Sequence, residues 1–88
     1  MFYVYILFSD KDKKLYTGYT PDLKARIKKH SSGYVKATKY RRPLRLVYYE
    51  AYQEEKDAKN REKFLKGGKG KVELKIQLKT FFEKIKIA

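Results

Sequence analysis

Hydrophobic residues are densest in a short run near the N-terminus, where aromatic and aliphatic side chains fill every position from 2 to 8. Such a run, FYVYILF, is typical of a strand that is buried on both faces. The polar, turn-forming segment SDKDKK follows it, and apolar residues return in KLYTGY. Two extended segments joined by a short polar connection predict a β-hairpin over residues 2–19.

The segment after the hairpin, TPDLKARIKKHSSG, predicts a helix. Thr20 can act as the N-cap, Pro21 fits the first helical position because it has no N–H to donate, and Asp22 suits the positive end of the helix dipole. We expect this helix to run to about Ser31 and to stop at Gly33, a residue that readily adopts the left-handed backbone conformation of a helix terminator.

The middle of the chain predicts a loop, a third strand and a second helix. Residues 34–43, YVKATKYRRP, read as a basic loop, and LRLVYYEAY at 44–52 reads as a strand. From Gln53 to Lys66 the pattern is helical, with acidic residues early and basic residues late. The glycine-rich GGKGK that follows is expected to be a flexible connector.

The last segment, VELKIQLKTFFEKIKI, fits two patterns. Its first apolar residues alternate as in a strand, yet Leu74, Leu78, Phe81 and Ile85 form a helical stripe. Its Glu, Lys, Gln and Leu content favours the helix. The predicted order is therefore β-β-α-β-α-α, an α+β fold in which a small three-stranded antiparallel sheet is flanked by helices. We expect one domain over 1–88, with a core at 2–70 and a helical extension at 71–88.

Composition adds an indication of the partner. The chain carries 23 Lys and Arg against 10 Asp and Glu, a net charge of +13, and it has no cysteine for a disulfide or a zinc–thiolate site. Such an excess favours a polyanionic partner, and nucleic acid more than a membrane because the cations are spread along the chain. A lysine-rich solvated surface is the alternative explanation. The sequence shows neither a signal-peptide pattern nor an apolar run of membrane-spanning length, so we expect a soluble cytoplasmic protein.

Polar residues occupy positions where a core-facing stripe would normally be apolar. On the first predicted helix, Arg26 and His30 lie on the same side as Leu23 and Ile27. Gly18, inside a predicted strand, weakens the strand and usually marks a bulge or a close approach of the backbone.

The second predicted helix repeats this arrangement. Arg61 and Glu62 lie on the same arc as Ala58 and Leu65. A carboxylate at the edge of a core stripe costs desolvation energy unless it is paired or bound to a cation. A structural ion pair of Glu62 with Arg26 or with Arg61 is one explanation, and a functional cation site is the other.

Taken together, these residues resemble the GIY-YIG nuclease family. The resemblance rests on YVYIL, on LYTGYTPDLKARIKKHSSG and on the later glutamate in NREKFLK, and it covers roughly residues 2–70. It is strongest to small stand-alone members, which are related to the nuclease module of the excision-repair incision subunit and of some homing endonucleases. The resemblance implies a metal-dependent endonuclease that acts on nucleic acid, DNA more than RNA, in repair or recombination, and that leaves 5′-phosphate and 3′-hydroxyl ends.

The resemblance also implies a role for five side chains. Tyr5 and Tyr16 match the two motif tyrosines, either of which could take a proton from water. Arg26 matches the catalytic arginine that stabilises charge on the scissile phosphate, and His30 could orient the water or a tyrosine hydroxyl. Glu62 matches the glutamate that holds one divalent cation, Mg²⁺ or Mn²⁺.

The chain departs from the family pattern at several positions. Tyr3 and Val4 stand where the first tripeptide has glycine and isoleucine, and Thr17 replaces the isoleucine before the closing Gly18. Tyr19 stands where the incision nucleases have a lysine, so a group that contacts phosphate or lowers the pKa of a tyrosine is expected to be missing.

The basic loop at 34–43 suits a nucleic-acid backbone, since its cations alternate with aromatic rings that could stack on bases. With Tyr19, the candidate binding residues are Lys36, Lys39, Tyr40, Arg41 and Arg42. Two other functions fit the same fold: a non-catalytic nucleic-acid-binding module, and a basic domain that binds other proteins. We expect no attached domain that would choose a target, so a separate protein could supply specificity.

Overall fold

The computed structural model describes residues 1–87, with side chains through Ile85. The elements along the chain are β1 (Phe2–Ser9), β2 (Leu15–Thr20), α1 (Leu23–Ser31), the short 3₁₀ helix η1 (Lys39–Arg41), β3 (Leu44–Tyr52), α2 (Glu55–Lys66), α3 (Gly68–Gln77) and α4 (Lys79–Ile87). The predicted hairpin, third strand and first two helices are confirmed, as is the α+β class.

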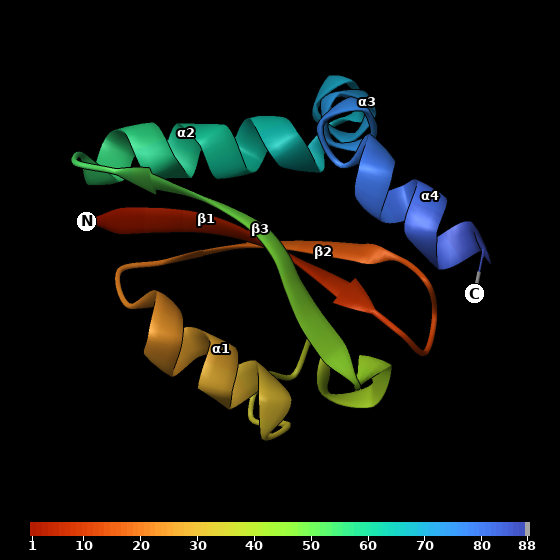
Figure 1. Cartoon of the computed structure of the whole chain (residues 1–88). Coiled ribbons are helices and arrows are strands. Elements are labelled where there is room, and N and C mark those ends of the chain that lie inside the picture. Colours follow the sequence, from red (N-terminus) through yellow and green to blue (C-terminus); the bar gives the residue numbers. More distant parts are fainter. Residues whose placement is uncertain (88) are drawn as a thin grey trace.

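The three strands form one antiparallel sheet in the order β2-β1-β3. The sheet lies between two layers of helix, with α1 on one side and α2 and α3 on the other (Figure 1). Because β1 is the central strand, both of its faces are covered, and all residues from Val4 to Ser9 are buried. This placement accounts for the unbroken apolar run at the N-terminus.

The main core lies between the sheet and the α2 side. Val4 and Ile6 of β1 pack there against side chains from the C-terminal helices, which are Ala58, Leu65, Leu74 and Leu78. Alternation along β1 turns Tyr5 toward the other side, where α1 lies. The sheet therefore uses one face for stability and presents the tyrosine on the other.

The start of α1 differs from the prediction. Asp22, not Thr20, is the N-cap, and its side chain accepts a hydrogen bond from the Ala25 backbone N–H. Thr20 remains in the strand, where its hydroxyl accepts from the Asp22 N–H. The Asp22 carboxylate directly precedes Leu23, so it reaches a free N–H group of the first turn. The end of the helix is as predicted, since Gly33 has a φ of +80°.

The predicted flexible connector GGKGK is wrong. Helix α3 begins at Gly68, directly after α2, and Gly70 is buried in the angle between the two helices. A Cβ on Gly70 would lie 2.2 Å from the Phe64 carbonyl oxygen and 2.4 Å from the Leu65 Cα. The glycine therefore permits close helix packing rather than mobility.

The last predicted helix is divided into α3 and α4 at Leu78, so the order is β-β-α-β-α-α-α. The helical interpretation of the segment is confirmed against the strand. Leu74 and Leu78 enter the core, and Phe81 packs edge-to-face on Phe8 with ring centroids 5.2 Å apart. The break turns both helices onto the sheet, which a single straight helix would not do.

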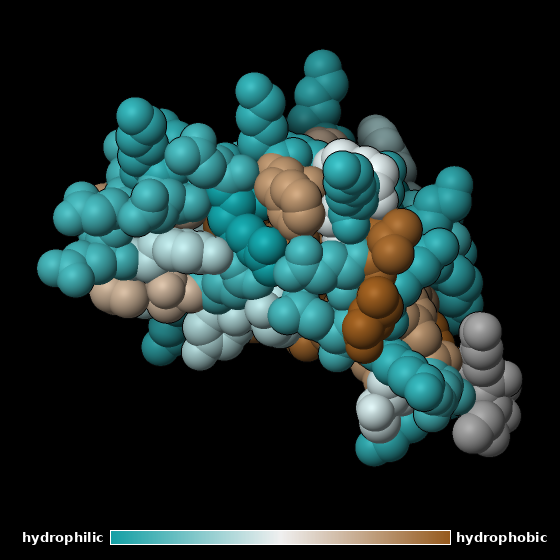
Figure 2. Space-filling model, turned by 90° about the horizontal axis from the view of Figure 1, so that it is seen from above, coloured by the Kyte–Doolittle hydropathy of each residue, from teal (hydrophilic) through white to brown (hydrophobic). Residues whose placement is uncertain are grey.

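The outer surface is mainly hydrophilic. Seen from the α2 and α3 side, it carries one narrow hydrophobic strip among polar atoms (Figure 2). On α3, Val72 and Ile76 are exposed. Across the part of the chain that the structure describes, no helix has the length and apolar content needed to cross a membrane.

Candidate active site

The site is centred on the ring of Tyr5 in β1, which packs over the backbone of β2 at Gly18. Tyr5 and Gly18 are direct partners in the sheet. A Cβ on Gly18 would lie 2.3 Å from both the Cζ and the hydroxyl oxygen of Tyr5. Only a glycine leaves room for the tyrosine ring here, so the predicted close approach at Gly18 is confirmed.

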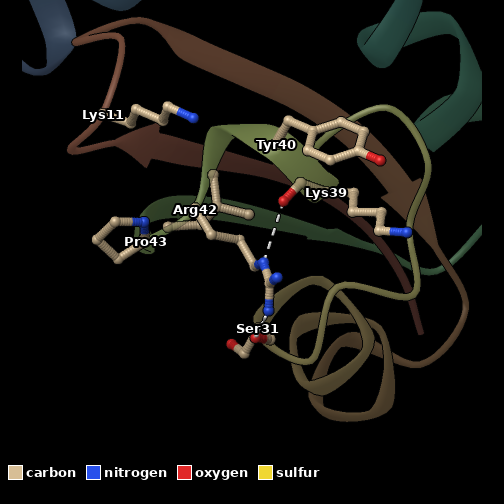
Figure 3. A pocket seen from close by; sticks show the side chains of 7 residues that line it. Lys11, Ser31, Lys39, Tyr40, Arg42 and Pro43 are labelled. Carbon is tan, nitrogen blue, oxygen red and sulfur yellow. Dashed lines mark hydrogen bonds between the residues drawn. The ribbon is translucent and has the colours of Figure 1, made fainter.

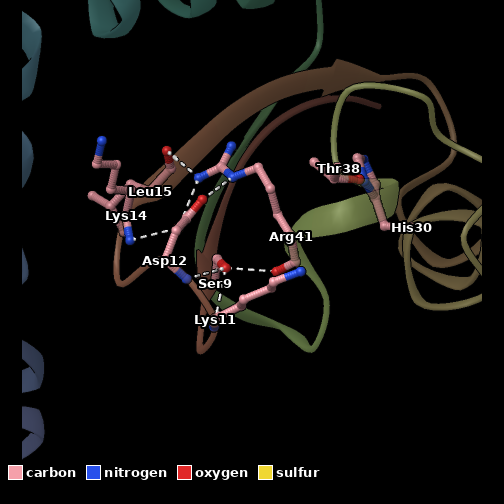
Figure 4. Close-up of polar contacts among 8 residues, drawn as sticks. All are labelled: Ser9, Lys11, Asp12, Lys14, Leu15, His30, Thr38 and Arg41. Carbon is pink, nitrogen blue, oxygen red and sulfur yellow. Dashed lines mark hydrogen bonds and ion pairs between the residues drawn. The ribbon is translucent and has the colours of Figure 1, made fainter.

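A hydrogen-bonded chain connects Tyr5 to α1 and to the loop that follows it. The Tyr5 hydroxyl is 2.7 Å from His30 Nε2, and His30 Nδ1 is 2.7 Å from Thr38 Oγ1. The three residues are almost completely removed from solvent, with exposures of 0%, 1% and 0%. Figure 4 shows Thr38 beside His30. The chain therefore reaches from the central strand through α1 into the basic loop.

Thr38 was not predicted from the sequence. It lies in the stretch that reads as a basic loop, where a single threonine carries no distinctive pattern. A usable signal would have been the histidine itself, because a buried imidazole needs a partner at each ring nitrogen. A neutral polar residue shortly after the helix was the nearest source of the second partner.

His30 is uncharged near pH 7. Burial, with a smaller contribution from the positive charge of Arg26, lowers the pKa of His30 to about 4. A neutral imidazole donates from one ring nitrogen and accepts at the other. If Nδ1 carries the hydrogen and donates to Thr38, then Nε2 accepts from the Tyr5 hydroxyl; the other tautomer reverses both bonds.

Arg26 contacts the same phenol. Its Nε donates to the Tyr5 hydroxyl over 3.4 Å, a long hydrogen bond from a half-buried guanidinium. Burial raises the pKa of Tyr5, the hydrogen bond from Arg26 lowers it, and the charges of Tyr16 and Glu62 raise it further. The net direction is upward, so the Tyr5 phenol is protonated at neutral pH.

Tyr16 completes an aromatic cluster around the histidine. Its ring centroid is 5.3 Å from that of His30 and 6.4 Å from that of Tyr5. Tyr16 is half-buried, unlike Tyr5. The structure thus brings four of the five predicted catalytic side chains together, on β1, β2 and α1.

The fifth, Glu62, comes from α2 and approaches this group from the other layer. Its charge contributes to raising the pKa of both Tyr5 and Tyr19, which puts the carboxylate within electrostatic range of the phenols. Its side chain is 23% exposed and forms an ion pair with Lys66 over 3.1 Å.

The ion pairs suggested for Glu62 do not form. Within residues 1–85, the carboxylate of Glu62 pairs with Lys66 and not with Arg26 or Arg61. Arg61 instead forms a bidentate pair with Glu50, at 2.9 and 3.0 Å, and a further bond to Glu73 at 2.8 Å. The structural explanation of Glu62 by a buried arginine pair is therefore removed.

A metal ion at Glu62 would rely on a single protein carboxylate. No group of three or more His, Asp or Glu side chains suited to a metal occurs in the described part of the chain. Mg²⁺ is commonly held by one or two carboxylates together with waters and substrate phosphate oxygens. A partly exposed Glu62, paired only with the flexible side chain of Lys66 among the described residues, fits that mode of binding. It does not fit a site in which protein side chains supply all the ligands.

The structure divides the predicted nucleic-acid-binding residues into two groups. Lys39, Tyr40 and Arg42 line a surface cavity of about 610 Å³, and Lys36 is exposed nearby in the loop. Arg41 points the other way: its Nε donates to Asp12 over 2.5 Å, and its carbonyl accepts from Ser9 (Figure 4). Arg41 therefore joins the loop to the β1–β2 turn.

The remaining motif positions lie on the α2 face of the hairpin. Val4 is buried in the main core, and Thr17 pairs with Ile6 in the sheet. The hydroxyl of Tyr19 donates to Glu55 over 2.6 Å, and burial together with Glu55 raises the pKa of Tyr19 to about 12. Tyr19 does not supply the positive charge of the lysine that it replaces.

Comparison with known proteins matches this arrangement to a family. The model of the GIY-YIG catalytic domain matches residues 1–76. The chain is 44% identical over 78 residues to a UPF0213 protein encoded in the ldhD 5′ region of Pediococcus acidilactici, a match that covers 84% of this chain and 78% of that protein. It is 46% identical over 67 residues to a UPF0213 protein of Clostridium perfringens, which covers 75% of this chain and 71% of the relative.

A solved structure shows the same fold. The solution NMR structure of a UPF0213 protein from Bacillus halodurans superimposes with a TM-score of 0.54 at 43% identity. The superposition covers 90% of this chain and 86% of that one. The family match, the relatives and the solved structure together confirm the resemblance inferred from the motif residues.

Proposed function

Because the chain belongs to the GIY-YIG family, we propose that it is a phosphodiesterase that cuts nucleic acid internally, DNA in preference to RNA. The observation that carries the proposal is the buried chain of Tyr5, His30 and Thr38 with Arg26 at its outer end. This arrangement offers a group that can take a proton and a guanidinium that can bind phosphate, the two functions that phosphodiester hydrolysis requires.

Tyr5 is the proton acceptor in this proposal, in preference to Tyr16. Tyr5 alone of the two has recorded hydrogen bonds to both His30 and Arg26 among the described side chains. As water attacks phosphorus, its proton passes to the Tyr5 oxygen while the phenolic proton passes to the neutral Nε2 of His30. The bond from phosphorus to the 3′ oxygen then breaks, the leaving 3′ oxygen takes a proton from solvent water, and His30 returns its proton through Tyr5 to solvent. The products are a 5′-phosphate and a 3′-hydroxyl.

The other side chains support this transfer. In the tautomer whose Nε2 can receive the proton, His30 carries its hydrogen on Nδ1 and donates it to Thr38 Oγ1. The planar fork of Arg26 suits two oxygens of the scissile phosphate. Glu62 would hold one divalent cation, Mg²⁺ or Mn²⁺, whose charge would offset that of the phosphate when it is bound.

A matched pair of substitutions tests the assignment. Tyr5→Phe removes the phenolic oxygen from the buried chain, whereas Tyr16→Phe removes one from the half-buried ring beside it. With labelled branched, duplex and single-stranded substrates in Mg²⁺ or Mn²⁺, Tyr5→Phe should abolish cleavage and Tyr16→Phe should retain most of it. The reverse result would assign the base to Tyr16.

Glu62→Gln tests the metal. The amide keeps the size of the side chain but is a poor ligand for a hard cation. The variant should fold, bind nucleic acid at least as tightly as the wild type, and cut nothing. Cleavage equal to that of the wild type would exclude Glu62 as the metal ligand.

The second candidate is a nucleic-acid-binding module without turnover. The complete burial of Tyr5 favours it, because an attacking water must reach a hydroxyl that the resting protein shields. In that case the wild type would bind the substrates and leave them uncut in both metals. For an active enzyme, we propose a role in repair or recombination, with target choice supplied by a separate protein.

A further inference from the structure

A basic surface cavity lies at the end of α1 that carries His30. The cavity of about 610 Å³ lies between the β1–β2 turn, the end of α1 and the loop around η1. We call it the η1 pocket; its lining includes Lys11, Ser31, Lys39, Tyr40, Arg42 and Pro43. Figure 3 shows Lys11 on one side of the pocket and Tyr40 with Lys39 on the other.

The charged side chains that line the η1 pocket are all positive. The lining contains the cations Lys11, Lys39 and Arg42, and none of the described residues that line the pocket is a carboxylate. The two acids of the adjacent turn are already paired, Asp12 with Arg41 and Asp10 with Arg45. The positive potential of the pocket is therefore not cancelled by its neighbours, and an anionic ligand is favoured.

Tyr40 adds an aromatic surface to these charges. Its side chain is 74% exposed, and the Lys39 ammonium lies 5.4 Å from the ring centroid. A large aromatic ring left in solvent beside cations is the arrangement that proteins use to stack on an unpaired base while holding its backbone. The volume is within the range of roughly 300–1,000 Å³ that is usual for sites of small ligands.

Hydrogen bonds from one side chain to backbone carbonyls hold the walls of the pocket together. Arg42 Nε donates to the Lys39 carbonyl over 3.1 Å, and Arg42 NH1 donates to the Ser31 carbonyl over 3.3 Å, so this side chain ties the two walls together (Figure 3). A Cβ on Gly33 would lie 2.9 Å from the Arg42 guanidinium carbon, so a glycine lets Arg42 reach the helix end.

The same walls carry the catalytic hydrogen-bonded chain. Ser31 directly follows His30, and Lys39 directly follows Thr38, the residue that bonds His30 Nδ1. The end of α1 and the loop around η1 therefore contribute both to the proposed catalytic group and to the η1 pocket, which is the basis for assigning a neighbouring nucleotide to the pocket.

We propose that the η1 pocket binds an unpaired nucleotide that flanks the scissile phosphate, with its base stacked on Tyr40 and its phosphate held by Lys11 and Lys39. The position relative to the scissile phosphate rests on the proposed function. Stacking on Tyr40 requires a base that is free of its own partner, so the substrate class is DNA with a single-stranded segment at the cut, such as a flap or a branch, rather than continuous duplex.

Two exposed tyrosines of the same loop give a matched test. Tyr40 lines the η1 pocket, whereas Tyr34 is 83% exposed and lines a separate cavity that contains Arg26. In EDTA, Tyr40→Ala should weaken binding of a labelled single-stranded oligonucleotide by roughly 5- to 100-fold. Tyr34→Ala should weaken it much less than Tyr40→Ala, and Tyr40→Phe should restore it. Equal losses in the two alanine variants would overturn the proposal.

A second pair separates position from net charge. Lys39→Ala and Lys36→Ala each remove one cation from the loop, but only Lys39 lines the pocket. Lys39→Ala should weaken binding of single strands more than Lys36→Ala, while the two should affect duplex binding alike. Two results would overturn the proposal and indicate general electrostatic attraction instead. One is an equal effect of the two lysine variants on single-strand binding, and the other is a Tyr40→Ala variant that weakens duplex binding as much as single-strand binding.

The binding assay in EDTA keeps this inference distinct from catalysis. Binding of single strands that depends on Tyr40 would support the pocket even if the wild type cuts nothing in Mg²⁺, an outcome that would overturn the nuclease alone. Cleavage by a Tyr40→Ala variant that also binds single strands normally would support the nuclease and overturn the pocket.

Discussion

The burial of His30 predicts that the protein loses stability in mildly acidic solution. The pKa of His30 is lowered to about 4 in the folded state, mainly by burial, whereas an unfolded chain titrates near 6.5. Between these pH values the unfolded state binds a proton that the folded state does not. The free energy of unfolding therefore decreases as the pH is lowered. The contribution is complete above about pH 6.5 and lost by about pH 4, and the difference corresponds to roughly 3 kcal/mol.

Few other groups should interfere in this range. His30 is the single histidine of the chain. The hydrogen bond from Arg41 lowers the pKa of Asp12 to about 2. Burial raises the pKa of Glu50, but hydrogen bonds led by that from Arg61 lower it overall. A carboxyl group with a lowered pKa loses its stabilising effect only at and below its unfolded pKa of about 4. The carboxyl groups therefore begin to destabilise the protein at the pH where the effect of His30 is already complete.

Urea unfolding at a series of pH values measures the effect, with His30→Gln as the control. Glutamine can still hydrogen-bond to Tyr5 and Thr38 but does not titrate. Between about pH 7.5 and about pH 4.5 the wild type should lose roughly 2–3 kcal/mol more than the variant. Parallel curves for the two proteins would refute the lowered pKa and, with it, the description of His30 as a neutral hydrogen-bonding partner.

Three further substitutions separate stability from catalysis. Gly18→Ala should push the Tyr5 ring out of place, lowering the free energy of unfolding by roughly 1–3 kcal/mol in urea titrations and abolishing cleavage. Arg26→Lys should leave the melting temperature nearly unchanged, because the positive charge is kept, while single-turnover cleavage falls by roughly 100-fold with the loss of the planar fork. Arg61→Met should cost on the order of 2 kcal/mol by leaving Glu50 without its bidentate partner, and the melting temperature should fall without a change in the Mg²⁺ requirement.

The sequence predicted most reliably those secondary-structure elements that are determined by residues close to them in the chain. Apolar runs, caps and glycine terminators lie within a few residues of the structure that they determine, so the hairpin, the third strand and the first two helices were found. Contacts between distant segments carry no such signal. Gly70 looked like part of a linker because the backbone that approaches it belongs to the preceding helix.

The same limit applied at the site. The family resemblance selected the catalytic residues, but it could not show that Thr38 bonds His30 or that Arg41 turns away to Asp12. Both facts depend on how the loop at 34–43 folds back, onto α1 for Thr38 and onto the hairpin for Arg41, which is 29 residues from Asp12. Sequence composition treated the cations of this loop alike, whereas the structure gives Arg41 and Arg42 different partners.

The polar positions on α1 can now be explained together. In α1, all of which the structure describes, His30 is the single buried residue, while Leu23 and Ile27 stay half-buried along a surface cavity. The helix is therefore held to the sheet at its C-terminal end by the hydrogen bond to Tyr5 more than by apolar packing. A leucine at position 30 would bury more apolar surface, but it would leave Tyr5 with only its long hydrogen bond from Arg26 and would remove the partner of the Thr38 hydroxyl, at roughly 1–3 kcal/mol for each bond lost. The residue proposed to receive the proton is thus also the one that docks the helix carrying Arg26, so His30 substitutions should change stability and cleavage together, whereas Arg26→Lys should change cleavage alone.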